Sequence, residues 1–101
     1  GVAQYDYACD VGYAFARASA VVHDGAIVAN FPGVAATMAQ VVEAIEIAAP
    51  SARGLIGWDE VTLPFPAVLE ATALETILGP LPQVSLAEGV AATIAHFRRS
   101  A

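Results

Sequence analysis

Only a few residues of this sequence carry side chains that could attack a substrate or hold a metal. A nucleophilic thiolate would require Cys9 to meet a histidine, either His23 or His96. We expect Cys9 instead to be a small buried thiol between a strand and a helix. We expect His23 to face water in a turn and His96 to lie on the surface of the last helix. His23 and Asp24 offer two metal ligands, which do not make a site.

Other catalytic patterns are incomplete or missing. Glu43 and Glu46 fall on the polar face of a predicted helix, which favours solvation, and nothing places Asp59 and Glu60 in a shared cleft. No serine lies in a Gly-x-Ser-x-Gly elbow. The stretch 54–57 lacks the third glycine of a phosphate-binding loop, and the sequence contains no lysine for a Tyr-x-x-x-Lys pair. The residues therefore predict no catalytic, cofactor-binding or metal-binding side chain in this chain.

Charge and cysteine content exclude several classes of protein. The net charge is −6 and all four basic residues are arginine, so we expect no nucleic-acid surface. One cysteine rules out an internal disulfide framework and a Cys-rich zinc site. It fits a reducing compartment, and we expect a cytoplasmic protein. Pro32 and Gly33 interrupt the uncharged run 25–42, so we expect no membrane span.

The composition is rich in apolar residues. Hydrophobic residues make up 57% of the 101 positions and charged residues 14%, against about 25% charged in a typical domain. A domain of this length buries only about two-thirds of the surface of its unfolded chain. We therefore expect some large apolar side chains to face a partner.

Capping patterns and hydrophobic periodicity predict a small mixed α/β domain. The predicted strands cover about 3–8, 26–29 and 55–58, and the predicted helices cover about 11–22, 38–49, 73–78 and 86–99. Capping boxes are expected to open three of the helices, at Thr37 with Gln40, Thr72 with Glu75, and Ser85 with Glu88. Asp10 is the expected N-cap of the remaining helix. The proline-rich stretch 63–66 is expected to be a stiff extended loop.

Three stretches of the chain occur in a characteristic order. They are Tyr5-Asp6-Tyr7-Ala8-Cys9-Asp10-Val11-Gly12, then Ala29-Asn30-Phe31-Pro32-Gly33 before Thr37, and then Glu70-Ala71-Thr72-Ala73 with Leu78-Gly79 and Pro82 to Ser85-Leu86-Ala87-Glu88-Gly89. In order and spacing they resemble the C-terminal part of extended short-chain dehydrogenases/reductases, the NAD-dependent epimerase/dehydratase family. The matching family motifs are Tyr-x-His-Val-x-Asp-Val-Ala, Tyr-Asn-x-Gly, Asp-x-Ser/Thr-Lys, Leu-Gly and Pro-x-Thr-x-Leu-x-Glu-Gly. The resemblance covers nearly the whole chain, with Tyr7 in place of the family histidine.

The resemblance implies that residues 1–101 form a single substrate-binding C-terminal region. The N-terminal Rossmann domain, which holds NAD or NADP and the Tyr-x-x-x-Lys pair, would be absent from this chain. The parent would be an NAD(P)-dependent sugar or sugar-acid epimerase, dehydrogenase or reductase, and this chain alone would bind no cofactor and not be catalytic. Its partners would be that Rossmann domain and a small-molecule substrate. The missing catalytic residues and the apolar surplus would then both be explained.

Departures from the family pattern bear on the substrate. Nucleotide-sugar epimerases of the family usually carry an arginine two residues before the strand tyrosine, where this chain has Ala3, and the segment between Gly54 and Ala73 contains no Arg or Lys. Guanidinium groups are the strongest side-chain contacts for a diphosphate. We therefore expect a smaller polyol, sugar acid or hydroxy-carbonyl compound rather than a nucleoside-diphosphate sugar.

Two aromatic residues are the predicted substrate-binding residues, both from their position. They are Tyr7, which replaces the family histidine, and Phe65 in the proline loop. The alternative for Tyr7 is a cross-strand or core aromatic. The alternative for Phe65 is a plug that fastens the loop to the core.

Two further interpretations of the whole chain stay open. The first is a stand-alone, non-catalytic α/β module that buries its apolar surplus by forming a homodimer. The second is a stand-alone enzyme with a site at Cys9 or His23. A discrete, cooperative dimer in solution would favour the module.

Overall fold

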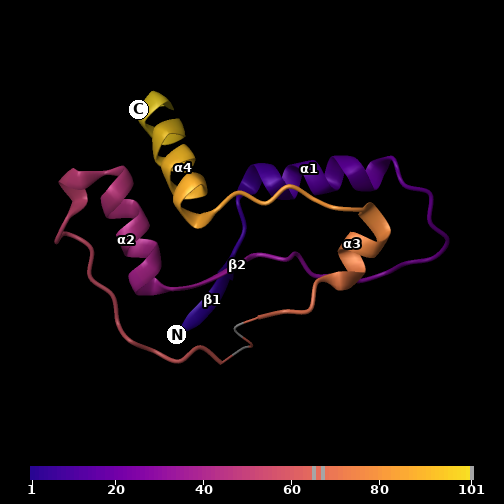
Figure 1. Cartoon of the computed structure of the whole chain (residues 1–101), viewed down its shortest axis with the longest axis horizontal. Coiled ribbons are helices and arrows are strands. Elements are labelled where there is room, and N and C mark those ends of the chain that lie inside the picture. The colour runs from indigo at the N-terminus through magenta and orange to yellow at the C-terminus, as the bar shows by residue number, and fades with distance from the viewer. Residues whose placement is uncertain (65, 67, 101) are drawn as a thin grey trace.

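A two-stranded antiparallel sheet lies between two pairs of helices in the computed structural model, which describes residues 1–64, 66 and 68–100 (Figure 1). Strand β1 (Val2–Tyr5) pairs with β2 (Val34–Thr37), with Val2 opposite Thr37 and Tyr5 opposite Val34. The helices are α1 (Ala8–Ser19), α2 (Met38–Ala48), α3 (Thr72–Leu78) and α4 (Leu86–Ser100), and a 3₁₀ turn, Pro50–Ala52, follows α2. Helix α2 packs on α4, and α1 packs on α3. The described part of the chain is therefore a small mixed α/β fold.

The capping boxes predicted for α2 and α4 are present, the second in altered form. Thr37 Oγ1 accepts a hydrogen bond from Gln40 N at 3.2 Å, and Gln40 Oε1 accepts one from Thr37 N at 2.8 Å. At α4, Ser85 Oγ accepts from Glu88 N at 3.1 Å. The Glu88 carboxylate accepts from the Ser85 hydroxyl rather than from its backbone N–H.

Of the helices that the structure describes, none is both long and apolar enough to cross a membrane.

Two of the predicted helix N-caps are wrong. Helix α1 begins at Ala8, with Tyr7 as its N-cap residue, and ends at Ser19 rather than at residue 22. Asp10, the predicted cap, lies in the first turn, where its carboxylate accepts a hydrogen bond from Val84 N. Helix α3 has Ala71 at its N-cap, so Thr72 belongs to the helix instead of capping it. The Asp10 carboxylate thus bonds with the distant Val84 N–H instead of capping its own helix.

Two of the three predicted strands are also wrong. β1 covers residues 2–5 rather than 3–8, while 26–29 and 55–58 lie outside any strand, with Val28 96% exposed. The second strand is β2, in a stretch for which the sequence predicts no strand. A strand is stabilised by backbone bonds and side-chain contacts with a neighbouring strand. β1 provides this neighbour for 34–37, and no described strand provides it for 26–29 or 55–58.

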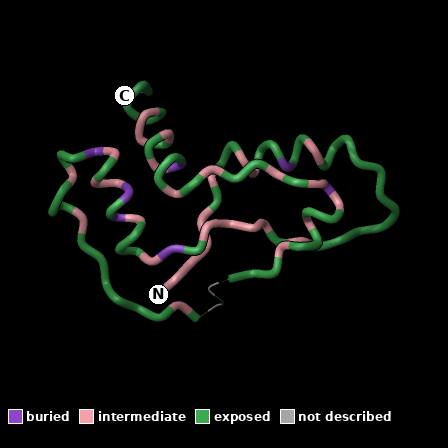
Figure 2. The backbone as a smooth tube through the Cα atoms, viewed as in Figure 1, coloured by how far each residue is buried: buried purple, intermediate pink, exposed green. Residues whose placement is uncertain are grey.

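Little of the molecule is buried (Figure 2). The buried hydrophobic residues are mostly small: Ala14, Ala36, Val42, Ala44, Ala49 and Leu78. The accessible surface is 7001 Å² for a chain of 10.3 kDa, whereas a typical folded monomer of this mass exposes about 5,400 Å². The radius of gyration is 16.1 Å, against about 13 Å for a compact domain of this length. Many large apolar side chains are left uncovered, and Phe15, Val22 and Leu55 are 69%, 98% and 79% exposed.

Candidate functional site

A groove of about 440 Å³ lies where β1 ends, between α2 and α4. Aliphatic side chains from the two helices line it, namely Val41 and Ile45 from α2 and Val90 and Ile94 from α4. Asp6 and Tyr7, from the turn between β1 and α1, line its remaining side. We call this the Tyr7 groove. Its volume falls within the range of about 300–1,000 Å³ typical of small-molecule sites.

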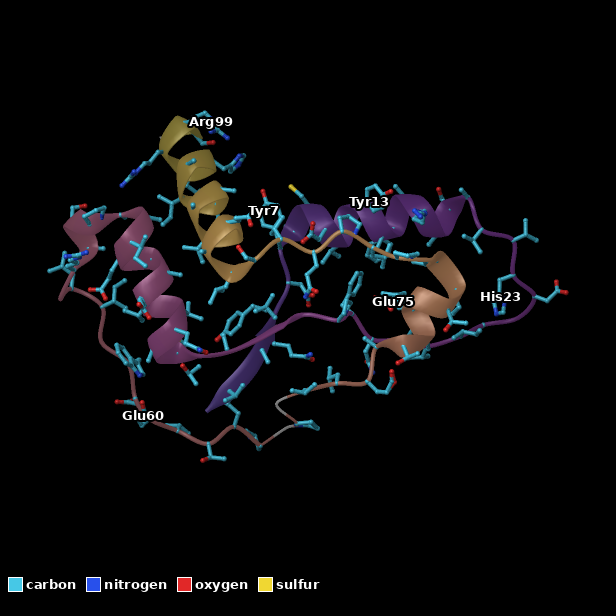
Figure 3. All side chains as sticks on the ribbon, in the orientation of Figure 1. Tyr7, Tyr13, His23, Glu60, Glu75 and Arg99 are labelled. Atoms are coloured by element: carbon cyan, nitrogen blue, oxygen red, sulfur yellow. The ribbon has the colours of Figure 1, made fainter. Side chains whose placement is uncertain are left out.

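Tyr7 lies against the backbone of α4. A Cβ atom placed on Gly89 would be 3.5 Å from Cδ1 of Tyr7 and 3.7 Å from its Cβ. Gly89 is itself a buried residue of α4. Because glycine has no side chain, the Tyr7 ring packs directly on the helix. Figure 3 shows Tyr7 between α4 and the beginning of α1. The predicted substrate-binding residue Tyr7 thus lines the groove, with its ring held by α4.

The pKa of the Tyr7 hydroxyl is raised above that of an ordinary tyrosine. The main cause is a hydrogen bond with the Cys9 side chain, followed by the charge of Cys9. Desolvation and the Asp10 carboxylate add to the rise, and Arg99 opposes it. Tyr7 therefore keeps its proton at neutral pH, so its hydroxyl is a hydrogen-bond donor there and not a base.

Asp6 owes its position to a neighbouring glycine. A Cβ atom on Gly33 would lie 3.2 Å and 3.3 Å from the two carboxylate oxygens of Asp6 and 3.0 Å from Cβ of Gln4. These separations are tighter than nine in ten real contacts of a Cβ atom. Gly33 therefore leaves room for the carboxylate, which places a negative charge at the edge of the groove.

Two long-range hydrogen bonds hold the segment that leads into α4. Asp10 Oδ2 accepts from Val84 N at 2.9 Å, and Gln83 Nε2 donates to the Pro32 carbonyl at 3.1 Å. A cavity of about 20 Å³ lies beside these groups, which is room for about one water molecule. The bonds fix where α4 begins, and so they set the position of one wall of the Tyr7 groove.

The cysteine and histidines do not assemble into a nucleophilic site. Cys9 is exposed in the first turn of α1, so the expectation that it is buried is wrong. Tyr13, one helical turn further along the same face of α1, is exposed as well, so the described part of the chain leaves this face open. His23 follows the opposite end of α1 and is exposed as expected (Figure 3). His96 is also exposed as expected and packs edge-on against Phe97, with 5.4 Å between ring centroids.

The acidic residues that the sequence offers as candidates do not form a shared site either, within the described part of the chain. Glu43 is exposed, as expected, but Glu46 is half-buried, and its Oε2 accepts a hydrogen bond from Gly54 N at 3.0 Å. Asp59 and Glu60 are exposed in the loop after the 3₁₀ turn. Within the described residues, no group of three or more His, Cys, Asp or Glu side chains could hold a metal ion.

Of the residues that line the Tyr7 groove, Tyr7 is the one that the sequence predicts as a substrate-binding residue. Phe65, the second predicted substrate-binding residue, lies outside the described residues. The roles of Gly33 and Gly89 were missed, although a glycine inside a predicted helix is a recognised signal of close packing. No family model, curated protein or solved structure matches this chain.

Proposed function

We propose that this chain is the substrate-side region of an NAD(P)-dependent enzyme resembling the extended short-chain dehydrogenases/reductases. A Rossmann domain would supply NAD or NADP and the catalytic Tyr-x-x-x-Lys pair. The reaction would be the oxidation, reduction or epimerisation of a small hydroxylated compound. The Tyr7 groove would be part of the substrate site.

The observation that carries the proposal is that its sequence motifs, far apart in the chain, contact one another. The first and last motifs meet where Tyr7 packs on Gly89. The second and third meet where Asn30 Nδ2 donates to the Glu70 carbonyl at 3.0 Å. Motifs that serve one site must come together in the folded chain. Contact between these two pairs therefore supports the proposal that the motifs belong to one site.

The charge of the groove supports a substrate other than a nucleoside-diphosphate sugar. Asp6 lines the groove, and no arginine or lysine does so among the described residues. A diphosphate would therefore meet a like charge without the bidentate guanidinium contacts that usually bind it. Binding of UDP- or GDP-sugars with micromolar affinity by the enzyme assembled with its nucleotide-binding domain would contradict this part of the proposal.

The large accessible surface, which includes many apolar side chains, supports a covering domain. The accessible area exceeds that of a typical monomer of this mass by about 1,600 Å². A standard protein interface covers about 800 Å² on each partner, and obligate interfaces cover more. An area of this size is therefore enough for a permanent interface with a second domain.

Oligomeric state and partner rescue test the proposal together. Alone, the chain should sediment as a monomer or as soluble aggregates that bind a hydrophobic dye. Co-expression with the nucleotide-binding domain of an extended short-chain dehydrogenase should give a one-to-one complex with reduced dye binding and with NAD(P)-dependent turnover of small hydroxy compounds. A discrete homodimer that unfolds cooperatively and binds no such domain would contradict the proposal. That result would favour the non-catalytic module, which the same exposed apolar side chains would also allow.

A further inference from the structure

The walls of the Tyr7 groove are mostly aliphatic, with the hydroxyl groups of Ser85 and Thr93 among them, and its edge is acidic. Val41 and Ile45 of α2 and Val90 and Ile94 of α4 are all half-buried and line the same space. Asp6 is the one charged side chain among the described residues that line it. The groove therefore combines an apolar surface, suited to a hydrocarbon chain, with a single negatively charged hydrogen-bond acceptor.

This combination disfavours two of the three substrate classes. The Ser85 and Thr93 hydroxyls in the groove already donate to the Glu88 carboxylate and to the Gly89 carbonyl. A polyol would therefore place most of its hydroxyl groups against aliphatic walls, where a polar group without a partner loses its hydration. A sugar acid would bring a second carboxylate to a groove that already holds Asp6, in a chain of net charge −6. A neutral hydroxy-carbonyl compound carries fewer hydroxyl groups and no charge, so it lowers the first cost and avoids the second.

We propose that the Tyr7 groove binds an uncharged hydroxy-carbonyl compound that carries an aliphatic chain. The chain lies between α2 and α4 against Ile45 and Ile94, and the hydroxyl group of the ligand donates to the Asp6 carboxylate. This inference rests on the proposed function in taking the groove as the substrate site, and it narrows the substrate to one class.

Binding of a graded series of ligands to the full chain tests the inference. The series is hydroxyacetone and its homologues up to 1-hydroxy-2-hexanone, with erythritol as the polyol and gluconate as the sugar acid. Binding is followed by NMR of the labelled isoleucine methyl groups. Affinity should rise about two- to fourfold with each added methylene, the upper value corresponding to full burial. The methyl signals of Ile45 and Ile94 should shift, whereas erythritol and gluconate should bind at least tenfold more weakly than the longest ketone.

Matched variants show whether the groove is responsible. Ile94→Ala should flatten the dependence on chain length, whereas Ile47→Ala, which alters an exposed residue of α2, should not. Asp6→Asn should weaken binding of the ketones and improve that of gluconate. The backbone NMR spectrum of each variant verifies that it is folded.

Several results would overturn the inference. They are affinity independent of chain length, equal or tighter binding of erythritol or gluconate, and no shift at Ile45 or Ile94 with any probe. None of them decides the proposed function, which is judged by complex formation with a nucleotide-binding domain. Conversely, chain-length-dependent binding without such a complex would support the ligand class and contradict the proposed enzyme.

Discussion

Asp10 Oδ2 accepts a hydrogen bond from the backbone N–H of Val84 at 2.9 Å, which joins the first turn of α1 to the residue before the Ser85 cap of α4. Val84 lines the Tyr7 groove, and Asp10 and Val84 both line the small cavity beside it. In a molecule with few buried side chains, one such bond has a large share in positioning a helix.

Replacing Asp10 should loosen the entry to α4. Asp10→Ala leaves the Val84 amide without its acceptor in a partly buried place, so we expect a loss of about 1–2 kcal/mol in unfolding free energy, measured by urea denaturation. The Val84 amide should also exchange faster with solvent deuterium. Asp24→Ala removes the same charge from an exposed turn and should change stability by less than about 0.5 kcal/mol. Equal losses in the two variants would show that the bond has no special role.

The two threonines that the sequence predicts as caps should behave differently. Thr37→Ala removes the hydroxyl that accepts from Gln40 N, and we expect it to cost about 1 kcal/mol. Thr72 is not at an N-cap. Its contact is with the exposed Glu70 carboxylate, so Thr72→Ala should cost less than about 0.5 kcal/mol. Denaturation of both variants gives the comparison, and a larger loss for Thr72→Ala would mean that it caps α3 after all.

Gly89 should accept alanine and reject a larger residue. The Cβ of Gly89→Ala would make ordinary contacts, at 3.4 Å from Val84 Cγ2 and 3.5 Å from Tyr7 Cδ1. Since glycine costs about 1 kcal/mol relative to alanine inside a helix, this variant should be as stable as the original chain or up to about 1 kcal/mol more stable. Gly89→Val adds two methyl groups against the Tyr7 ring and should lower the melting temperature. A fully stable Gly89→Val would contradict the packing of Tyr7 on α4.

Titration of Tyr7 should depend on Cys9. Cys9→Ala removes the largest cause of the raised Tyr7 pKa, so its phenol should ionise at lower pH than in the original chain. Phenolate absorbance measures this, and subtracting the curve of Tyr7→Phe isolates the signal of this residue. An unchanged titration curve in Cys9→Ala would refute the assigned cause.

The same shift determines how stability depends on pH. The folded state favours protonated Tyr7, so the contribution to stability is complete below the unfolded pKa of about 10. It is lost as the pH rises above that value through the folded pKa. The original chain should therefore lose stability more steeply than Tyr7→Phe in this alkaline range. Parallel curves for the two proteins would contradict the linkage.

Local sequence signals determined helices α2, α3 and α4. The Thr37 and Ser85 caps, the periodic apolar positions behind them and the glycine that ends α3 act within one or two turns. Their effect does not depend on the rest of the fold, and for this reason these helices were predicted close to their observed bounds.

Tertiary structure decided which segment pairs with β1, which group the Asp10 carboxylate bonds with, and where the groove lies. The stretches 26–29 and 34–37 each contain two β-branched residues and two alanines, yet only 34–37 lies beside β1. Asp10 could have capped a helix, but the Val84 amide, distant in the sequence, comes within reach of its carboxylate. A residue can bond only with groups that the fold brings near it. Local sequence patterns do not reveal which groups from distant parts of the chain these will be. The same reason explains why the contacts of Tyr7 with Gly89 and of Asp6 with Gly33 became visible only in the folded chain.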